Sequence, residues 1–462
     1  MLFNSLLFLF FFLIVTSAYY LIPHRFRWLW LLTASCYFYM YFVPQYILII
    51  FFTILIDYCA GILIENSAGK NRKMYLMLSL AANIGVLAFY KYFDFLAQNI
   101  NFILPFFEAP KIPLLNILLP IGLSFHTFQA MSYTIEVYKG NQKAEKHFGI
   151  YSLYVLFYPQ MVAGPIERPQ HMLHQLKRLS VFNKKNLIAG IFLIMLGLFK
   201  KVVIADRLGL YVDPVFANPH GHSALDLIIA TYFFAFQIYC DFSGYSDIAI
   251  GAALTLGIEL MKNFNTPYLS KNIAEFWKRW HISLSTWFRD YVYIPLGGNR
   301  VSIRILSINI LIVFLLSGLW HGANWKYIVW GFIHGCLLII YQLLKKLKIE
   351  IKGFAWLKWL ITFNLICIAW IFFRANNLSD AIYILNKILS YRPFFYSANY
   401  LMMPAEIYYC FFIILALIAG ERYLQNAVEL SNPKKIISVI VLVFACYFLG
   451  IFNEAQFIYF QF

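Results

Sequence analysis

The sequence contains little charge. Asp, Glu, Lys and Arg make up 13% of its 462 residues, against about 25% in an average soluble domain. Hydrophobic residues make up 62% and aromatic residues 20%. A charge content this low excludes a water-soluble globular enzyme, and so much apolar surface excludes a disordered chain. The composition therefore indicates a membrane protein.

The sequence also lacks the cysteine patterns of a disulfide framework or a metal centre. Its seven cysteines lie mostly inside apolar runs, and no two of them are spaced as CxxC. We interpret them as small buried hydrophobic residues. The sequence predicts no metal site, and no cofactor that stays bound.

Long apolar runs predict an all-α polytopic membrane protein, since a helix needs about 20 apolar residues to cross the hydrocarbon core. Outer-membrane barrels would instead alternate polar and apolar residues. Stretches without Asp, Glu, Lys or Arg cover 1–24, 28–56, 74–90, 112–135, 147–166, 305–325, 327–344 and 436–453, and shorter ones cover 186–199, 227–240, 359–373 and 407–420. Pro44 is expected to divide the second run. The pattern predicts about 11–13 membrane-embedded helices, including re-entrant and interfacial ones.

Basic residues exceed acidic ones by 37 − 21 = 16 and cluster in short loops. This pattern is typical of positive-inside topology and of contact with anionic lipids, and it does not indicate a nucleic-acid partner. If Arg25 and Arg27 lie in the cytoplasm, the segment 271–304 lies there too and both termini lie outside. The first 22 residues lack a basic region, which favours a retained span over a signal peptide. We expect one transmembrane domain over 1–462, with N-terminal spans at about 1–100, a core at about 115–375 and C-terminal spans at about 405–462.

Residues 271–300 combine aromatic residues at helical spacing with a histidine. The spacing predicts an amphipathic helix at the cytoplasmic interface. His281 falls on the aromatic face and is expected to point into the protein. A single histidine on an apolar face is more often a hydrogen-bonded core residue than a catalytic one, so this segment alone leaves both possibilities open.

The sequence LSGLWHGAN places His321 between Gly318 and Gly322 at the end of an uncharged span. Glycines permit close backbone approach and end a helix, and an ionisable group at membrane depth is a candidate functional residue. The alternative is a helix–turn hinge in which His321 bonds a neighbouring carbonyl. His334, in the next span, is either that partner or a second polar lining.

Two further segments place polar residues in apolar surroundings. Residues 157–172 contain three prolines, a glycine and Gln160, so we expect irregular backbone that is either re-entrant or a surface loop. Residues 237–251 contain Asp241 and Ser243 within a long apolar region, which predicts a cavity wall. Asp241 is alternatively the partner of a basic residue.

Together these segments resemble the membrane-bound O-acyltransferase (MBOAT) family, and within it the bacterial alginate O-acetyltransferase-like branch. The resemblance spreads over about three-quarters of the chain, in the family's order. It is carried by PIGLSFHTFQAMSY (120–133), FYPQMVAGPIERP (157–169), QIYCDFSGYSDIAIG (237–251), FWKRWHISLSTWFRDYVYIPLGGNR (276–300), LWHGANWKYIVWGFIHG (319–335), FRAN (373–376) and FIYFQF (457–462).

The resemblance implies a central tunnel, with His321 as the catalytic histidine and His281 as the second motif histidine. FIYFQF is similar to the end of a small membrane peptide of teichoic-acid D-alanylation, which makes Tyr459 a candidate acyl carrier. The remaining candidates for substrate binding, donor binding or tunnel lining are Trp320, Asn324, Arg289, Asp290, Asp241, Ser243, Gln160 and His334. We hypothesise that a neutral His321 takes the hydroxyl proton of Tyr459 or of an acceptor that enters from outside, while His281 or Asn324 orients the thioester carbonyl or the substrate.

The implied activity is O-acyl transfer in the bacterial inner (plasma) membrane. The donor is an acyl thioester that serves as substrate, acetyl-CoA or an acyl carrier protein. The acyl group passes to an extracytoplasmic polysaccharide through a periplasmic or cell-surface acetyltransferase of the SGNH type, with membrane lipids as surroundings. The alternatives are a D-alanyl transferase for teichoic acid and a non-enzymatic transporter of polymer or lipid. A transporter would show repeated halves, and none is visible in the sequence.

Overall fold

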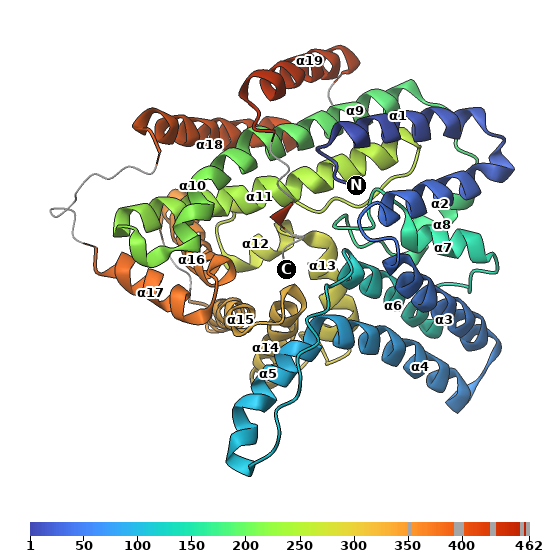
Figure 1. Ribbon diagram of the computed structural model, residues 1–462, viewed down its shortest axis with the longest axis horizontal. Helices are drawn as coiled ribbons and strands as arrows, with labels where there is room; N and C mark the ends of the chain where they lie inside the picture. The colour runs from blue at the N-terminus through green and yellow to red at the C-terminus, as the bar shows by residue number, and fades with distance from the viewer. Residues whose placement is uncertain (350–352, 392–401, 426–430, 453–456, 459–462) are drawn as a thin grey trace. The chain divides into compact units, whose positions relative to one another are not determined.

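The computed structural model describes residues 1–349, 353–391, 402–425, 431–452 and 457–458 (Figure 1). These residues form helices joined by turns and irregular segments, with no strand among them, which confirms the all-α fold class. Nine of the described helices or continuous helical stretches are long and apolar enough to cross a membrane. They cover Tyr46–Asn66, Gly69–Phe107, Lys184–Ala217, Ala224–Thr255, Ile303–His321, Trp325–Lys346, Ala355–Arg374, Pro404–Glu421 and Asn432–Leu449.

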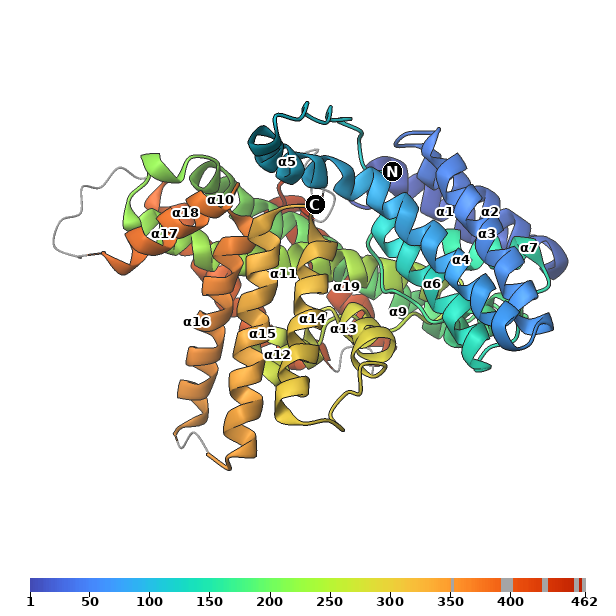
Figure 2. The same cartoon turned by 90° about the horizontal axis from the view of Figure 1, so that it is seen from below.

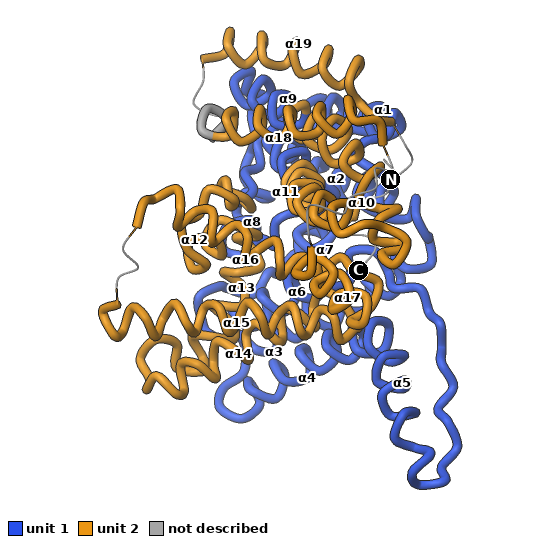
Figure 3. The backbone as a smooth tube through the Cα atoms, turned by 90° about the vertical axis from the view of Figure 1, so that its left-hand side faces the viewer, with its two compact units in different colours: residues 1–194, 246–261 blue, residues 195–245, 262–462 orange. Residues whose placement is uncertain are grey.

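The chain packs into two compact units (Figure 3). One comprises residues 1–194 and 246–261, and the other residues 195–245 and 262–462. Helix α9 (Lys184–Leu198) and helix α11 (Ala224–Thr255) each contribute residues to both units. The three-part division of a single domain expected from the sequence stays a prediction.

The first unit is built from helices α1 to α8. Their bounds are α1 (Leu6–Leu21), α2 (His24–Met40), α3 (Tyr46–Asn66), α4 (Gly69–Leu87), η1 (Ala88–Tyr92), α5 (Phe93–Ile103), η2 (Leu104–Phe107), α6 (Leu123–Lys139), α7 (Phe148–Leu156) and α8 (Pro169–Lys177). Helix α2 ends before Pro44 and α3 begins after it, so this proline divides its run as expected. Helices α3, α4 and α6 pack against one another (Figure 2).

A buried polar cluster joins α3 and α4. The carboxylate of Asp57 accepts hydrogen bonds from Ser79 Oγ at 2.6 Å and from Asn83 Nδ2 at 2.9 Å, and all three side chains are fully buried. Because unsatisfied polar groups are costly in an apolar interior, these bonds favour one arrangement of the two helices. The first unit is therefore held by specific polar contacts as well as by apolar packing.

The second unit contains the remaining helices. Their bounds are η3 (Phe199–Ala205), α10 (Asp206–Ala217), η4 (Pro219–Gly221), η5 (Pro267–Leu269), α12 (Ile273–Arg279), α13 (Ile282–Phe288), η6 (Arg289–Tyr293), α14 (Ile303–His321), α15 (Trp325–Lys346), α16 (Ala355–Arg374), α17 (Leu378–Leu389), α18 (Pro404–Gln425) and α19 (Asn432–Leu449). Helices α14, α15 and α16 run side by side (Figure 2).

The prediction of one amphipathic helix over 271–300 is wrong. Helix α12 ends at Arg279 and α13 begins at Ile282, and between them His281 has the left-handed backbone angles φ 42° and ψ 57°. A residue with a β-carbon adopts this conformation at a cost of about 1–2 kcal/mol. The break turns the chain at His281, so the histidine lies at a corner between two short helices.

Glycines bring α14 and α15 into close contact. A β-carbon on Gly318 would lie 2.2 Å from the carbonyl oxygen of Tyr327, and one on Gly331 would lie 2.2 Å from that of Phe314. Real β-carbons do not approach backbone atoms this closely, so larger residues at either position would force the helices apart.

We therefore expect Gly318→Ala to destabilise the protein by about 1–3 kcal/mol, the usual cost of overpacking a core. Thermal unfolding of the detergent-purified protein, followed by size-exclusion chromatography, measures the change. Gly85→Ala is the matched control, because no atom lies within 4 Å of its β-carbon position. Equal melting temperatures for the two variants would contradict the close approach of α14 and α15.

Candidate active site

In the second unit, two of the predicted site histidines, His281 and His321, lie against the ring of the same tryptophan. The ring of Trp320 lies 6.1 Å from the ring of His281 and 5.0 Å from that of His321, between centroids. All three side chains are buried. Residues that are 40 positions apart in the sequence therefore belong to one cluster.

His321 is the last residue of α14, and Gly322 caps the helix. The sequence prediction that the glycines end the helix here is confirmed. The imidazole is surrounded by aromatic rings, with Trp330 at 5.0 Å and Phe373 of α16 at 5.3 Å. A β-carbon on Gly322 would lie 2.2 Å from the ring of Tyr327, so the turn after His321 depends on glycine.

The polar contacts of His281 define which of its nitrogens carries the proton. Its Nδ1 lies 3.1 Å from Oδ1 of Asn263, and the amide N–H and hydroxyl of Ser283 donate to the same oxygen at 3.2 and 2.9 Å. An atom that accepts a backbone N–H is the oxygen of the carboxamide, so Nδ1 of His281 is the donor. The lone pair of the neutral ring is therefore on Nε2, which can accept a hydrogen bond but cannot donate one.

Burial keeps His281 neutral. Its side chain is 1% exposed, and desolvation of the charged form lowers its pKa from 6.5 to about 3. An imidazole with this pKa is uncharged over the whole physiological range. The residue thus combines a fixed tautomer with a fixed charge, both set by its surroundings.

His334 lies on α15, one helical turn after Trp330. The ring of Trp330 is 5.0 Å from His321 and 4.9 Å from His334, so the tryptophan stands between the two histidines. Both ring nitrogens of His334 are buried without a hydrogen-bond partner among the described residues. His334 is therefore not the hydrogen-bonding partner of His321, and the alternative of a second polar group in the same cluster remains.

Asp241 pairs with a basic residue, which is one of the two alternatives predicted from the sequence. Its Oδ1 lies 2.7 Å from Nζ of Lys201, which also contacts Oδ1 of Asp206 at 2.8 Å. Lys201 lies in the π-helical turn η3 and is 1% exposed.

The same cluster contacts residues near the end of the chain. The backbone N–H of Ile458 donates to the other oxygen of Asp241 at 2.8 Å, and the ring of Phe457 lies 4.5 Å from Nζ of Lys201. The ion-pair cluster thus anchors residues 457–458, whereas Tyr459 lies outside the described residues.

The other predicted residues have structural or surface contacts. Asn324 caps α15 by accepting the amide of Lys326 at 3.1 Å. Arg289 and Asp290 form an exposed pair at 2.8 Å in η6, and Ser243 is buried on α11 next to Asp241.

Gln160 belongs to the first unit and donates to the carbonyl of Tyr154 at 2.9 Å. Its surrounding segment, 157–168, is irregular and almost wholly buried, which confirms irregular backbone and excludes the surface loop.

Sequence reasoning missed two residues of the second unit, Asn263 and Lys201. Asn263 precedes His281 by 18 positions in an irregular stretch, and no spacing rule links them. Lys201 stands among apolar residues, where a lysine that pairs with a buried carboxylate was a detectable signal. Among the residues that the structure describes, no group of three or more His, Cys, Asp or Glu side chains is arranged to hold a metal ion.

Comparison with known proteins adds a family match. The profile of MBOAT, the membrane-bound O-acyltransferase family, matches residues 146–379. This range contains the two histidines, Trp320 and Asn263. The match therefore falls on the part of the sequence that forms the aromatic cluster.

Individual relatives match most of the chain. The Peptidoglycan O-acetyltransferase of Helicobacter pylori is 37% identical over 424 residues, covering 84% of this chain and 80% of that protein. The Probable alginate O-acetylase AlgI of Pseudomonas aeruginosa is 37% identical over 441 residues, covering 94% of this chain and 84% of that protein. The Teichoic acid D-alanyltransferase of Bacillus subtilis is 28% identical over 334 residues, covering 65% of this chain and 81% of that protein.

Proposed function

From the premise that this chain belongs to the membrane-bound O-acyltransferase family, we propose that its donor is acetyl-CoA and its final acceptor an extracytoplasmic polysaccharide. The chain is a multi-pass membrane O-acyltransferase. We place the protein in the bacterial inner membrane with the basic 271–304 segment on the donor side, where Arg289 and Arg300 attract the phosphates of CoA.

The proposal rests mainly on one observation, that His281 and His321 are both buried and both contact the ring of Trp320. Both histidines lie within the family match. Burying two ionisable rings in an apolar interior costs free energy, and ionisable residues found at such depth are therefore candidate functional residues. Acyl transfer from a thioester to a hydroxyl group requires a base of this kind.

In the proposed reaction, His321 takes the proton of the acceptor hydroxyl as its oxygen attacks the thioester carbonyl. The carbon–oxygen bond forms and the carbon–sulfur bond breaks. The proton then passes from His321 to the departing thiolate, which leaves as the free thiol. The ring of His281 lies on the other side of Trp320. Because its proton is on Nδ1, its Nε2 orients the acceptor molecule by accepting a hydrogen bond from it and cannot donate one to the thioester carbonyl.

The experiment that identifies the donor supplies the purified protein in proteoliposomes with radiolabelled acetyl-CoA or, separately, with D-alanyl carrier protein. Consumption of acetyl-CoA with release of free thiol supports the proposal. Consumption of the aminoacyl carrier protein alone would instead support D-alanyl transfer, the alternative that the 28% identical relative represents.

Asn263 is proposed as a positioning residue, because it fixes the tautomer of His281. We expect Asn263→Ala to lower kcat by about 10–100-fold with a smaller change in KM, as loss of a histidine's orienting partner does elsewhere. Asn263→Asp should restore most of the activity, since a carboxylate still accepts from Nδ1. Its negative charge raises the pKa of His281, so the fall of activity on the acid side should move to higher pH.

The pH profiles of the two variants distinguish positioning from folding. A merely structural role for Asn263 would leave the acid limb of the Asp variant where it is in the wild type. Loss of activity in both variants at every pH, with both proteins folded, would contradict the positioning role.

Tyr459 is proposed as a transient acyl carrier that takes the acetyl group from the donor and passes it to a partner acetyltransferase of the SGNH type outside the membrane. Support comes from its neighbours Phe457 and Ile458, which are buried and bound to Lys201 and Asp241. We expect Tyr459→Phe to abolish transfer to the polysaccharide. In the wild type, mass spectrometry after incubation with donor should find one acetyl group on the peptide that contains Tyr459.

The anchoring contacts use the backbone of Ile458 and the ring of Phe457, so the phenylalanine variant keeps them and serves as its own folding control. Undiminished transfer by Tyr459→Phe would exclude the acyl-tyrosine route. Direct attack by the acceptor hydroxyl would then be the mechanism, with His321 in the same function.

A further inference from the structure

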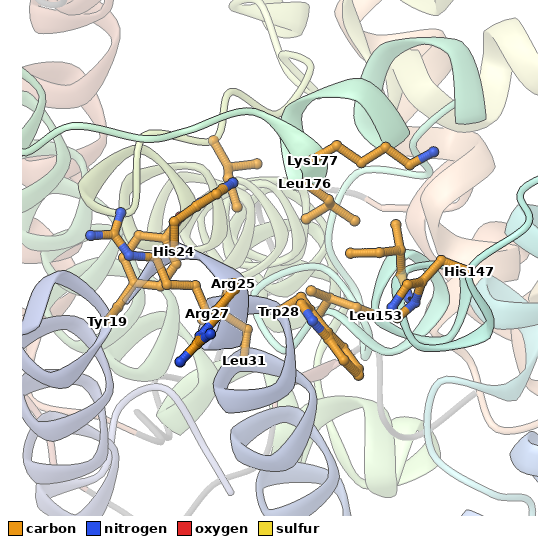
Figure 4. Close-up of a pocket in the computed structure, with 12 residues that line it drawn as sticks. Tyr19, His24, Arg25, Arg27, Trp28, Leu31, His147, Leu153, Leu176 and Lys177 are labelled. Atoms are coloured by element: carbon orange, nitrogen blue, oxygen red, sulfur yellow. Dashed lines mark hydrogen bonds between the residues drawn. The ribbon is translucent and has the colours of Figure 1, made fainter. Parts of the chain in front are cut away.

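A small basic pocket lies within the first unit, at the turn between α1 and α2 (Figure 4). Its volume is about 190 Å³. Basic side chains reach it from two sides, Arg25 and Arg27 from α2 and Lys177 from the end of α8, and Trp28 and His147 lie together at another edge. None of these residues belongs to the aromatic cluster of the candidate active site.

The two arginines leave the pocket with uncompensated positive charge. Arg27 donates to the carbonyls of Ile22 at 3.0 Å and of Ser180 at 2.6 Å, which fix the guanidinium without neutralising it. Arg25 is exposed and lies over the ring of Phe26. Among the described residues neither arginine forms an ion pair, whereas Lys177 pairs with Glu145 at 2.6 Å.

Two other groups supply hydrogen-bond donors beside these positive charges. Helix α2 begins at His24 after Pro23, and no side chain caps it, so its first amide groups present the positive end of the helix dipole near the arginines. The amide of Ile150 donates to Nδ1 of His147 at 3.2 Å, so the neutral ring carries its proton on Nε2. The chemistry of the pocket therefore selects an anion with several acceptor oxygens.

The volume and the apolar lining of the pocket further limit which ligands it can hold. A volume of about 190 Å³ is below the roughly 300–1,000 Å³ of pockets that hold a drug-sized molecule, so the pocket fits a phosphate and a few carbons but no whole nucleotide. Leu31, Leu153 and Leu176 supply an apolar wall beside the charges. A polar anionic head with an apolar continuation matches this lining.

We propose that the pocket binds the phosphate of an anionic phospholipid headgroup. It lies at the C-terminal end of α1, an apolar helix of 16 residues, and we place this helix end at the level of the lipid phosphates. Basic pockets of this kind between membrane helices bind anionic headgroups. The inference is independent of the acyl donor and of the function of His321.

Native mass spectrometry of the protein taken from vesicles of equal phosphatidylglycerol and phosphatidylcholine tests the proposal. We expect the wild type to retain phosphatidylglycerol in preference to phosphatidylcholine. Arg25→Glu should lower this retention by about tenfold, because it reverses one charge near the phosphate. Arg25→Lys should keep it. Among the described residues, the Arg25 side chain has a single polar or ring contact, the one with Phe26, so its variants are expected to fold.

Arg178→Glu is the matched control, since Arg178 is exposed beside Lys177 but does not line the pocket. It should retain phosphatidylglycerol as the wild type does. Equal retention of both lipids by the wild type, or undiminished retention by Arg25→Glu, would overturn the proposal. Displacement of phosphatidylglycerol by millimolar inorganic phosphate would also overturn it, because the site would then take a soluble phosphate.

Discussion

Replacing His321 by alanine is expected to lower acetyl transfer by about 10²–10⁴-fold, the usual contribution of a positioned general base. The imidazole stands at the end of α14 among Trp320, Trp330 and Phe373. The ring of Trp330 separates His334 from the position of His321. We therefore expect that His334 cannot replace His321 as the base. The measurement is thiol release from acetyl-CoA by the purified variant, together with the acetyl content of the polysaccharide in cells.

His174→Ala is the control for this variant, because His174 is exposed on α8 in the first unit. It should transfer acetyl groups at the rate of the wild type. Size-exclusion chromatography in detergent checks that both variants are folded. Normal acetylation by a folded His321→Ala protein would contradict the assignment of the general base.

Replacing Lys201 by methionine is expected to destabilise the protein by about 3–5 kcal/mol, the cost of removing one partner from a buried ion pair. Asp241 and Asp206 both contact this lysine within 2.8 Å, so the variant would leave two carboxylates without their cation. It would also remove the cation beneath Phe457. Thermal unfolding and the yield of folded protein in detergent measure the effect.

Lys185→Met is the control, since Lys185 is an exposed lysine of α9. Substitution of an exposed side chain usually changes the free energy of unfolding by less than about 0.5 kcal/mol. The Lys185 variant should therefore lose much less stability than the Lys201 variant. Equal losses would show that the ion pairs with Asp206 and Asp241 do not hold the second unit together.

Most of the fold class followed from the sequence, because apolar length and periodicity depend on local composition. The division at Pro44 and the helix end at His321 were predicted for the same reason. The break at His281 was not, because the spacing of the aromatic residues in 271–300 fits one helix. Its left-handed backbone is stabilised by Asn263, whose backbone carbonyl accepts the amide of Ile282 at 2.9 Å. Such a long-range contact leaves no periodic signal.

The candidate site was predicted in part. His281 and His321 were identified from burial patterns and resemblance, but their meeting at Trp320 depends on tertiary packing. Arg289 and Asp290 form a surface pair and Asn324 caps a helix, contacts that the sequence pattern does not reveal. Their function in substrate or donor binding stays a prediction. A residue type indicates what a side chain can do, whereas its neighbours decide what it does.

We propose that His321 mediates acyl transfer between opposite sides of the membrane. The most direct test uses proteoliposomes with acetyl-CoA confined to one side and an acceptor polysaccharide, with its secreted acetyltransferase, confined to the other. We expect labelled acetyl groups to appear on the polysaccharide with wild-type protein and not with His321→Ala. Labelled polysaccharide in liposomes that carry the alanine variant, or acetylation only when donor and acceptor share one side, would contradict it.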